Sequence, residues 1–230
     1  EVNRIMPNYI ARMWMKDNEG DISAVLYGPS SITFEAEKYD KKVTIIEETN
    51  YPFSGQIDFQ IRSAEQIEFG LSLRIPGWCN NAKILVNGAE FRDTIRPGTF
   101  IKIKRLFSNN DRITLMLPME LKLCKWPIGG ISLERGPIVF SLGIKAKMER
   151  DMNEPRCTDE MPAWNIYPEQ AWNYALALNN KTLKKDVDIV FAPMSPEPWG
   201  LDKAPIMLKV PARRVIGRSE ERRVGKECRS

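Results

Sequence analysis

The sequence predicts an all-β fold in which antiparallel sheets pack face to face, after a short helix near the amino end. The main observation is one-sided alternation: apolar and polar side chains alternate through residues 56–62, and residues 67–75 repeat the pattern. Asn87-Gly88 lies between two apolar runs and predicts a tight hairpin, because both turn positions need a positive φ. Pro118 ends this series, and a second set of strands is expected to follow it.

Each expected element follows from a local pattern along the chain. Residues 3–15 carry apolar side chains at helical spacing, and the turn signal at 17–20 ends this helix. Residues 99–104 and 112–117 are expected to pair with each other through the polar residues 108–111, and residues 147–162 to form a long loop. Strands are expected at 21–27, 42–47, 56–62, 67–75, 83–86, 99–104, 112–117, 121–126, 136–142, 172–176, 187–191 and 206–210.

The composition excludes several classes of catalyst. The 230 residues include no histidine, so Ser-His-Asp and Cys-His mechanisms are excluded within this chain. The four cysteines are widely spaced and form no C-x-x-C pair, which favours idle thiols over a zinc site or a disulfide framework. They are Cys79, Cys124, Cys157 and Cys228. No apolar run is long enough to span a bilayer, and no signal peptide is visible.

The two ends of the sequence need separate treatment. The chain starts without methionine, so we expect it to begin inside a longer protein, whose compartment stays open. Residues 218–230 (RSEERRVGKECRS) match the translation of a common sequencing adapter and are interpreted as an artefact. Removing the five basic and three acidic residues of this segment lowers the formal net charge from +4 to +2. We therefore predict neither a nucleic-acid partner nor a membrane partner.

An aromatic cluster is the most prominent candidate for ligand binding. Trp164, Tyr167, Trp172 and Tyr174 fall within eleven residues, and Trp and Tyr rings stack on the apolar faces of sugars. The alternative is that Trp164, Trp172 and Tyr174 fill a sandwich core or cover a sheet edge. We favour the core, because residues 172–176 alternate as a strand does.

Other candidate groups are assigned structural roles. The carboxylate pairs Glu35/Glu37 and Glu47/Glu48 are expected on a solvated sheet face, although glycosidases use two carboxylates. Gly129-Gly130 and Arg135-Gly136-Pro137 are interpreted as turn residues, not as an anion loop. Asn180-Lys181-Thr182 fits the glycosylation pattern, which often occurs by chance. No catalytic or metal-binding residue is assigned, and no substrate-binding residue is known.

An ordered series of short motifs then resembles glycoside hydrolase family 127, the β-L-arabinofuranosidase family. The motifs are Tyr51-Pro52-Phe53-Ser54-Gly55, Leu73-Arg74-Ile75-Pro76-Gly77-Trp78-Cys79, Val86-Asn87-Gly88, Leu117-Pro118-Met119, Glu134-Arg135-Gly136-Pro137-Ile138-Val139-Phe140 and Trp172-Asn173-Tyr174. Residues 204–214 also look like the family's last domain. The resemblance covers nearly all of residues 1–217.

The resemblance implies a domain order. Residues 1–17 would be the remnant of the last helix of an (α/α)6 catalytic barrel. Residues 18–120 would be the middle β-sandwich, residues 121–217 the carboxy-terminal one, and residues 218–230 the artefact. Both sandwich domains would be antiparallel and jelly-roll-like, and their partner would be the barrel that is absent from this chain.

The resemblance also implies what this chain lacks. Family members hold zinc with one Glu and three Cys, and a zinc-bound thiolate is the nucleophile in a retaining hydrolysis. Their Cys-Cys pair precedes a segment like Glu1-Val2-Asn3-Arg4, and Cys79, Cys124 and Cys157 do not match the ligands. Asn3 and Arg4 would have been near the active site of the parent, without an assigned role. We therefore expect an accessory fragment that is inactive alone and binds no zinc, whereas the parent would bind zinc and an arabinose-containing glycan. The alternatives are a stand-alone carbohydrate-binding module and a structural sandwich of another barrel glycosidase or lyase.

Overall fold

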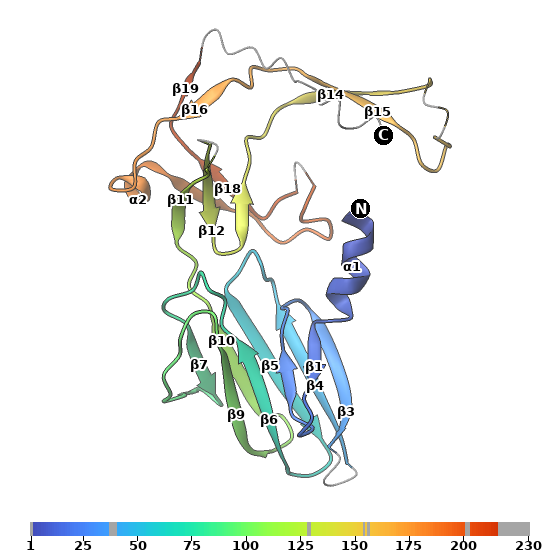
Figure 1. Cartoon of the computed structure of the whole chain (residues 1–230), viewed down its shortest axis with the longest axis vertical. Helices are drawn as coiled ribbons and strands as arrows, with labels where there is room; N and C mark the ends of the chain where they lie inside the picture. The colour runs from blue at the N-terminus through green and yellow to red at the C-terminus, as the bar shows by residue number, and fades with distance from the viewer. Residues whose placement is uncertain are drawn as a thin grey trace. The chain divides into compact units, whose positions relative to one another are not determined.

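The computed structural model describes residues 2–36, 41–127, 130–153, 155, 157–200 and 203–215, with no side-chain description for residues 2–4. The chain divides into two compact units, Glu1–Val139 and Phe140–Ser230, and each is described by itself. Strands predominate in the described residues, whose two helices are short: α1 (Val2–Ile10) and α2 (Leu183–Asp186) (Figure 1). The predicted all-β class is therefore confirmed. The predictions for Glu37, Gly129 and residues 218–230 lie outside the described residues.

Two sheets form the main body of the first unit. One has four strands, and its β2–β6 contact is parallel whereas its other contacts are antiparallel. Its order is β1 (Trp14–Lys16), β2 (Ile22–Ala24), β6 (Ile67–Arg74) and β9 (Phe100–Phe107). The second sheet has six antiparallel strands. Its order is β3 (Ser30–Ala36), β4 (Lys41–Thr49), β5 (Gln56–Ser63), β10 (Arg112–Met116), β7 (Lys83–Val86) and β8 (Ala89–Glu90).

The core lies between these two sheets, on the faces that the alternation predicted. Ile57, Phe59 and Ile61 of β5 are fully buried, and β6 contributes the alternate positions from Ile67 to Leu73. The rings of Phe69 and Phe107 pack with centroids 4.5 Å apart. Burying one such large apolar side chain contributes about 1.5–3 kcal/mol. The predicted turn at Asn87-Gly88 is also confirmed, with φ values of 50° and 81°.

Two expectations for the secondary structure of the first unit are wrong. The helix ends at Ile10 and not at residue 15, because the Met13 carbonyl accepts the N–H groups of Val25 and Leu26 and Trp14 pairs with Ala24 in β1. The strands expected at 99–104 and 112–117 do not pair with each other. β9 pairs with β6 in one sheet, and β10 pairs with β5 and β7 in the other. The polar connection between them carries the chain from one layer to the next.

The remaining strands form smaller sheets. A three-stranded sheet has the order β11 (Leu121–Lys125), β12 (Ile131–Arg135) and β13 (Ile138–Phe140). In the second unit the described strands form three antiparallel pairs, and β14 occupies the start of the loop expected at 147–162. The pairs are β14 (Ala146–Arg150) with β15 (Trp164–Pro168), β16 (Tyr174–Leu176) with β19 (Ala212–Arg214), and β17 (Asp188–Phe191) with β18 (Ile206–Lys209). The domain boundary between residues 120 and 121 stays a prediction. None of the described helices has the length and apolar character needed to cross a membrane.

Candidate functional site

Three of the motifs that carry the family resemblance lie together at one end of the sandwich. Arg135 Nη1 donates to the Phe53 carbonyl at 3.4 Å and lies 3.5 Å from Met119 Sδ. Nearby, the Leu117 N–H donates to the Gly55 carbonyl at 2.8 Å. Three motifs that are distant in the sequence, 51–55, 117–119 and 134–137, therefore form one structural cluster.

Two glycines make this cluster possible. A Cβ on Gly55 would lie 2.0 Å from the Leu117 carbonyl oxygen. Gly136 has φ +58°, and a Cβ there would lie 2.8 Å from Met119 Cγ. The turn role predicted for Gly136 is thus supported by its left-handed backbone, which disfavours any residue with a Cβ.

Two tyrosines and an arginine extend the cluster into the core. The Tyr27 hydroxyl donates to the Arg74 carbonyl at 2.6 Å, and the Arg74 guanidinium carbon lies 5.8 Å from the centre of the Tyr27 ring. The Tyr51 ring packs edge-on against Tyr27 with centroids 5.8 Å apart. Burial raises the pKa of both phenols, so they stay neutral and act as packing and hydrogen-bonding groups.

Glu47 is buried, and its expected place on a solvated sheet face is wrong. Its side chain is only 2% exposed. Oε1 accepts the Gly28 N–H at 3.0 Å, and Oε2 accepts the Ser30 hydroxyl at 3.0 Å. Burial raises the pKa of Glu47 to about 7, and these two hydrogen bonds offset the effect only in part. Val43 and Ile45 are buried on the same strand, so the period-two pattern did contain the signal that Glu47 points inward.

The neighbouring acids behave as predicted. Glu48 and Glu35 are exposed, as alternation along β4 and β3 requires.

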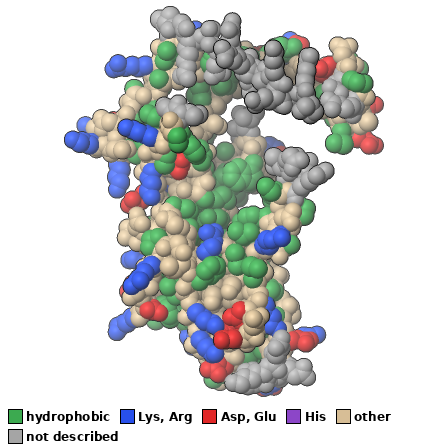
Figure 2. Space-filling view, viewed as in Figure 1, with side chains coloured by type: hydrophobic (Ala, Val, Ile, Leu, Met, Phe, Trp, Pro, Cys, Tyr) green, Lys and Arg blue, Asp and Glu red, His purple; other side chains and the backbone are tan. Residues whose placement is uncertain are grey.

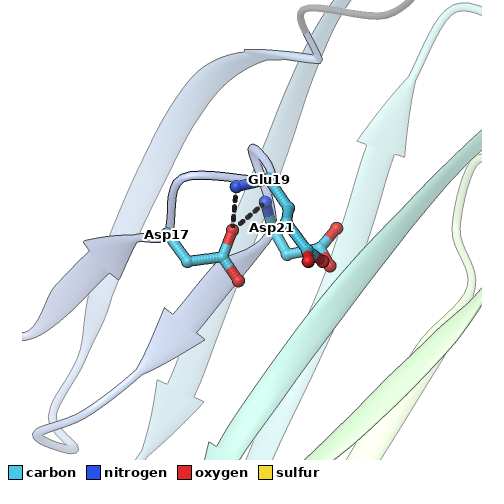
Figure 3. Close-up of side chains that lie close together, drawn as sticks. All are labelled: Asp17, Glu19 and Asp21. Carbon is cyan, nitrogen blue, oxygen red and sulfur yellow. Dashed lines mark hydrogen bonds between the residues drawn. The ribbon is translucent and has the colours of Figure 1, made fainter.

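Three other acids were not singled out by the sequence. Within the described part of the chain, Asp17, Glu19 and Asp21 form the group whose ligand oxygens all lie within 4.8 Å of one another (Figure 3). They occupy the turn between β1 and β2. Asp17 Oδ1 accepts the backbone N–H groups of Glu19 and Asp21, each at 2.9 Å, which fixes the turn. The spacing D-x-E-x-D was the sequence signal that could have predicted this group, because alternate positions of a turn can bring their carboxylates close together.

Lys102 of β9 supplies the positive charge for this acidic trio. Its Nζ lies 2.6 Å from Asp21 Oδ2, 3.3 Å from Glu19 Oε2 and 3.5 Å from Asp17 Oδ2. Burial raises the pKa of Asp21, but the hydrogen bonds from Lys102 and from the Gly70 N–H outweigh it, so the pKa is below its usual value. The hydrogen bond to Asp21 in turn raises the pKa of Lys102. An ammonium group thus already occupies the place that a metal ion would take.

Charges of both signs are distributed over the surface. On the face that Figure 2 shows, acidic and basic side chains are interspersed on the first unit and do not form one basic face.

The cysteines do not assemble into a metal centre in the described residues. Cys79 is buried, whereas Cys124 and Cys157 are half-buried, and all three are free thiols. Burial raises the pKa of Cys79, and a hydrogen bond with Glu134 raises that of Cys124. Neither thiol has the lowered pKa that a nucleophile or metal ligand needs. The described residues therefore do not fit the zinc site that the family resemblance implies.

The aromatic cluster does not form a core, so that prediction is wrong. Trp164 is 48% exposed and Tyr174 is 43% exposed, whereas Trp172 is half-buried. Trp164 lies in the β14–β15 pair and Tyr174 in the β16–β19 pair, so the structure places them on different sheets. Every residue of β15 and β16 is exposed, because each of these strands belongs to a two-stranded ribbon.

Comparison with known proteins shows what the sandwich is similar to. Residues 21–119 match the family model described as beta-L-arabinofuranosidase, GH127 middle domain. A GH127 β-L-arabinofuranosidase from Geobacillus stearothermophilus T6 has a similar structure, with 24% identity and a TM-score of 0.54 over 73% of this chain and 33% of that one. A second GH127 β-arabinofuranosidase has 21% identity and a TM-score of 0.52 over 78% of this chain and 32% of that one. No curated protein matches the sequence.

These comparisons define what the chain contains. At such identities the structural likeness concerns the fold, and the chain spans about a third of the length of the two solved structures. The family model matches the two sheets whose core is described above. Residues 21–119 of this chain therefore resemble the middle domain of glycoside hydrolase family 127.

Proposed function

We propose that this chain is the non-catalytic accessory region of a β-L-arabinofuranosidase-like enzyme that removes terminal arabinofuranosides from glycans. The observation that carries the proposal is the family match over residues 21–119, which coincides with the sandwich. In this proposal the sandwich braces a separate catalytic domain, and the chain alone cleaves no glycosidic bond. The catalytic domain would hold the zinc that the resemblance implies.

The chemistry of the buried acids supports a structural role. A glycosidase needs two carboxyl groups that flank the scissile bond and can reach the sugar. Glu47 is enclosed by the sandwich, and both of its oxygens accept hydrogen bonds. Asp21 is bound to Lys102 and to the Gly70 N–H. Both carboxyl groups are held by contacts within the sandwich, so no reaction step is assigned to them.

The catalytic domain is proposed to cover α1. Ile5 and Ile10 are each 64% exposed, and Met6 is 53% exposed. Meanwhile Tyr9 of the same helix is anchored, because its hydroxyl donates to the Tyr27 carbonyl at 2.8 Å. The helix is thus fixed on the sandwich while it presents apolar side chains that another domain would bury.

The first test is turnover by the purified 230-residue chain. It is incubated with p-nitrophenyl β-L-arabinofuranoside in the presence of zinc and a thiol reductant, against a blank without protein. We expect release of nitrophenol at the rate of the blank. Release above the blank that scales with protein concentration would contradict the non-catalytic role.

A stand-alone carbohydrate-binding module is the second candidate, and the exposed ring of Trp164 favours it. This alternative predicts heat of binding to arabinose oligosaccharides in calorimetry, lost in Trp164→Ala or Trp172→Ala. The matched control is Trp126→Ala, because Trp126 is 52% exposed but lies in the first unit. The accessory role predicts no binding by any of these proteins.

A structural sandwich from another barrel glycosidase or lyase is the third candidate. The coding sequence upstream separates it from our proposal. A Cys-Cys pair encoded just before Glu1, with an additional Cys and a Glu further upstream, would favour the arabinofuranosidase. A barrel sequence without that pair would favour the third candidate.

A further inference from the structure

Two chains of hydrogen bonds connect the amino-terminal segment to Glu47. In the first, the Tyr9 hydroxyl donates to the Tyr27 carbonyl at 2.8 Å, and the N–H of Gly28 donates to Glu47 Oε1 at 3.0 Å. This carbonyl and this N–H belong to one peptide unit, so the two bonds polarise each other.

The second chain begins further along the sequence. Trp14 Nε1 donates to Ser30 Oγ at 3.0 Å, and the Ser30 hydroxyl donates to Glu47 Oε2 at 3.0 Å. The carboxyl group is thus the common acceptor for contacts that start on α1 and on β1.

The same segment also packs against a neighbour of Glu47. The Trp14 ring packs edge-on against Phe59 with centroids 6.0 Å apart, and Phe59 is the cross-strand partner of Glu47. Ser30 is its partner on the other side. Two ionisable groups interact electrostatically with Glu47: Tyr9 from α1 and Tyr27 from the β2–β3 connection, and Arg74 from the end of β6 interacts with both tyrosines. Arg74 Nε already donates to the Val25 carbonyl.

We propose that residues 5–16 form a pH-sensitive latch that closes over Glu47 when its carboxyl group is protonated and loosens when that group is ionised. The physical reason is hydration. A closed latch keeps water from the carboxylate, whereas an open latch lets water return, so opening is easier for the ionised form. The inference stands on the burial of Glu47 and on the contacts that connect residues 5–16 to its surroundings, while the hydrogen bonds donated to the carboxyl group oppose the effect only in part. It does not depend on the proposed function.

The size of the effect follows from the two states of Glu47. Its pKa is about 7 in the closed structure, against 4.5 for the free side chain. If opening restores the free value, the equilibrium constant for opening rises about tenfold between pH 6 and pH 8.5. The direction follows from burial, because a carboxyl group that is only 2% exposed prefers its neutral form until water reaches it.

Hydrogen exchange of the whole chain, read by mass spectrometry at pH 6 and pH 8.5, tests this latch. After correction for the intrinsic pH dependence of exchange, residues 5–16 should exchange about tenfold faster at pH 8.5. Residues 67–74 of β6 should stay protected over the same time, which shows that the latch opens without global unfolding. Glu47→Gln should remove the pH dependence. Glu48→Gln is the matched control, because Glu48 is exposed on the same strand, and it should retain the dependence.

Three results would overturn the latch: no pH dependence in the parent chain, the same dependence in Glu47→Gln, or joint exchange of residues 5–16 and 67–74. If Glu47→Gln does not fold, Ser30→Ala decides the question. It removes one of the two hydrogen bonds that lower the pKa of Glu47. The pH at which the latch loosens should therefore move upward, and an unchanged midpoint would refute the proposal.

Discussion

Gly70→Ala gives a direct test of how tightly the acidic trio is fixed to the sheet. Gly70 lies in the middle of β6, and its N–H donates to Asp21 Oδ1 at 2.7 Å. A Cβ at this position would lie 2.6 Å from Asp21 Cγ and Oδ2 and 2.7 Å from Lys102 Cε. The lysine carbon can move, but the Asp21 side chain is only 7% exposed and has little space.

The magnitude follows from what the new methyl group displaces. Overpacking a filled site costs about 1–3 kcal/mol, and losing a hydrogen bond to a buried charged group costs about 1.5–3 kcal/mol. Alanine recovers about 0.4–1 kcal/mol, because it restricts the unfolded chain more than glycine does. We therefore expect Gly70→Ala to lower the free energy of unfolding by about 3 kcal/mol.

Urea unfolding followed by far-ultraviolet circular dichroism measures this change. Gly77→Ala is the control, because no heavy atom lies within 4 Å of the place its Cβ would take, and it should change stability by less than about 0.5 kcal/mol. In an Asp21→Ala background the carboxylate that the new Cβ would meet is absent. Gly70→Ala should then lower the free energy of unfolding by less than about 1 kcal/mol. Equal costs in both backgrounds would refute the close contact between Gly70 and Asp21.

Three further predictions concern the core and its buried acid. Glu47→Gln should raise the free energy of unfolding by about 3 kcal/mol at pH 8.5 and leave it nearly unchanged at pH 4.5, as measured by urea unfolding. The reason is that the folded pKa of about 7 exceeds the ordinary 4.5, so stability present below pH 4.5 is lost as the pH rises through 7. Gly55→Ala should lower the free energy of unfolding by at least about 3 kcal/mol and reduce the yield of soluble protein, because its Cβ would lie 2.0 Å from the Leu117 carbonyl oxygen. A stability equal to that of Gly77→Ala would contradict this prediction. Phe59→Ala should lower the free energy of unfolding by about 3–5 kcal/mol, because Phe59 is fully buried. Phe100→Ala should lower it much less, because Phe100 is 49% exposed. Thermal melting of both variants measures the difference.

The sequence predicted the faces of the strands well. Ile57, Phe59 and Ile61 were expected on one side and are all fully buried. This success has a local cause, because successive side chains of a strand point to opposite faces whatever the strand pairs with. The turn at Asn87-Gly88 was equally local, since it depends on residues that tolerate a positive φ.

Strand pairing was less predictable. β9 and β10 follow each other closely in the sequence, yet they lie in opposite layers. Their separation depends on hydrogen bonds with β6 and β5, which no local pattern encodes. The same applies to Trp14, whose place in β1 depends on pairing with Ala24 and overrides the helical spacing of residues 3–15.

The exposed aromatic residues show a different limit. Alternation through residues 172–176 suggested a buried face, but burial requires a second layer that covers the strand. Tyr174 is 43% exposed on a two-stranded ribbon. A sequence pattern gives the direction of a side chain relative to its own strand, and not what lies opposite it.

The sequence by itself determined the all-β class, the inward faces of β5 and β6, the absence of histidine chemistry and the ordered motifs of the family. Only the tertiary structure decided in which direction the pKa of each buried acid is shifted. Asp21 meets the ammonium group of Lys102, which is remote in sequence, whereas Glu47 is enclosed with only partial compensation. The physical reason is that the energy of a charge depends on the water and the charges within a few ångströms, and folding sets those distances.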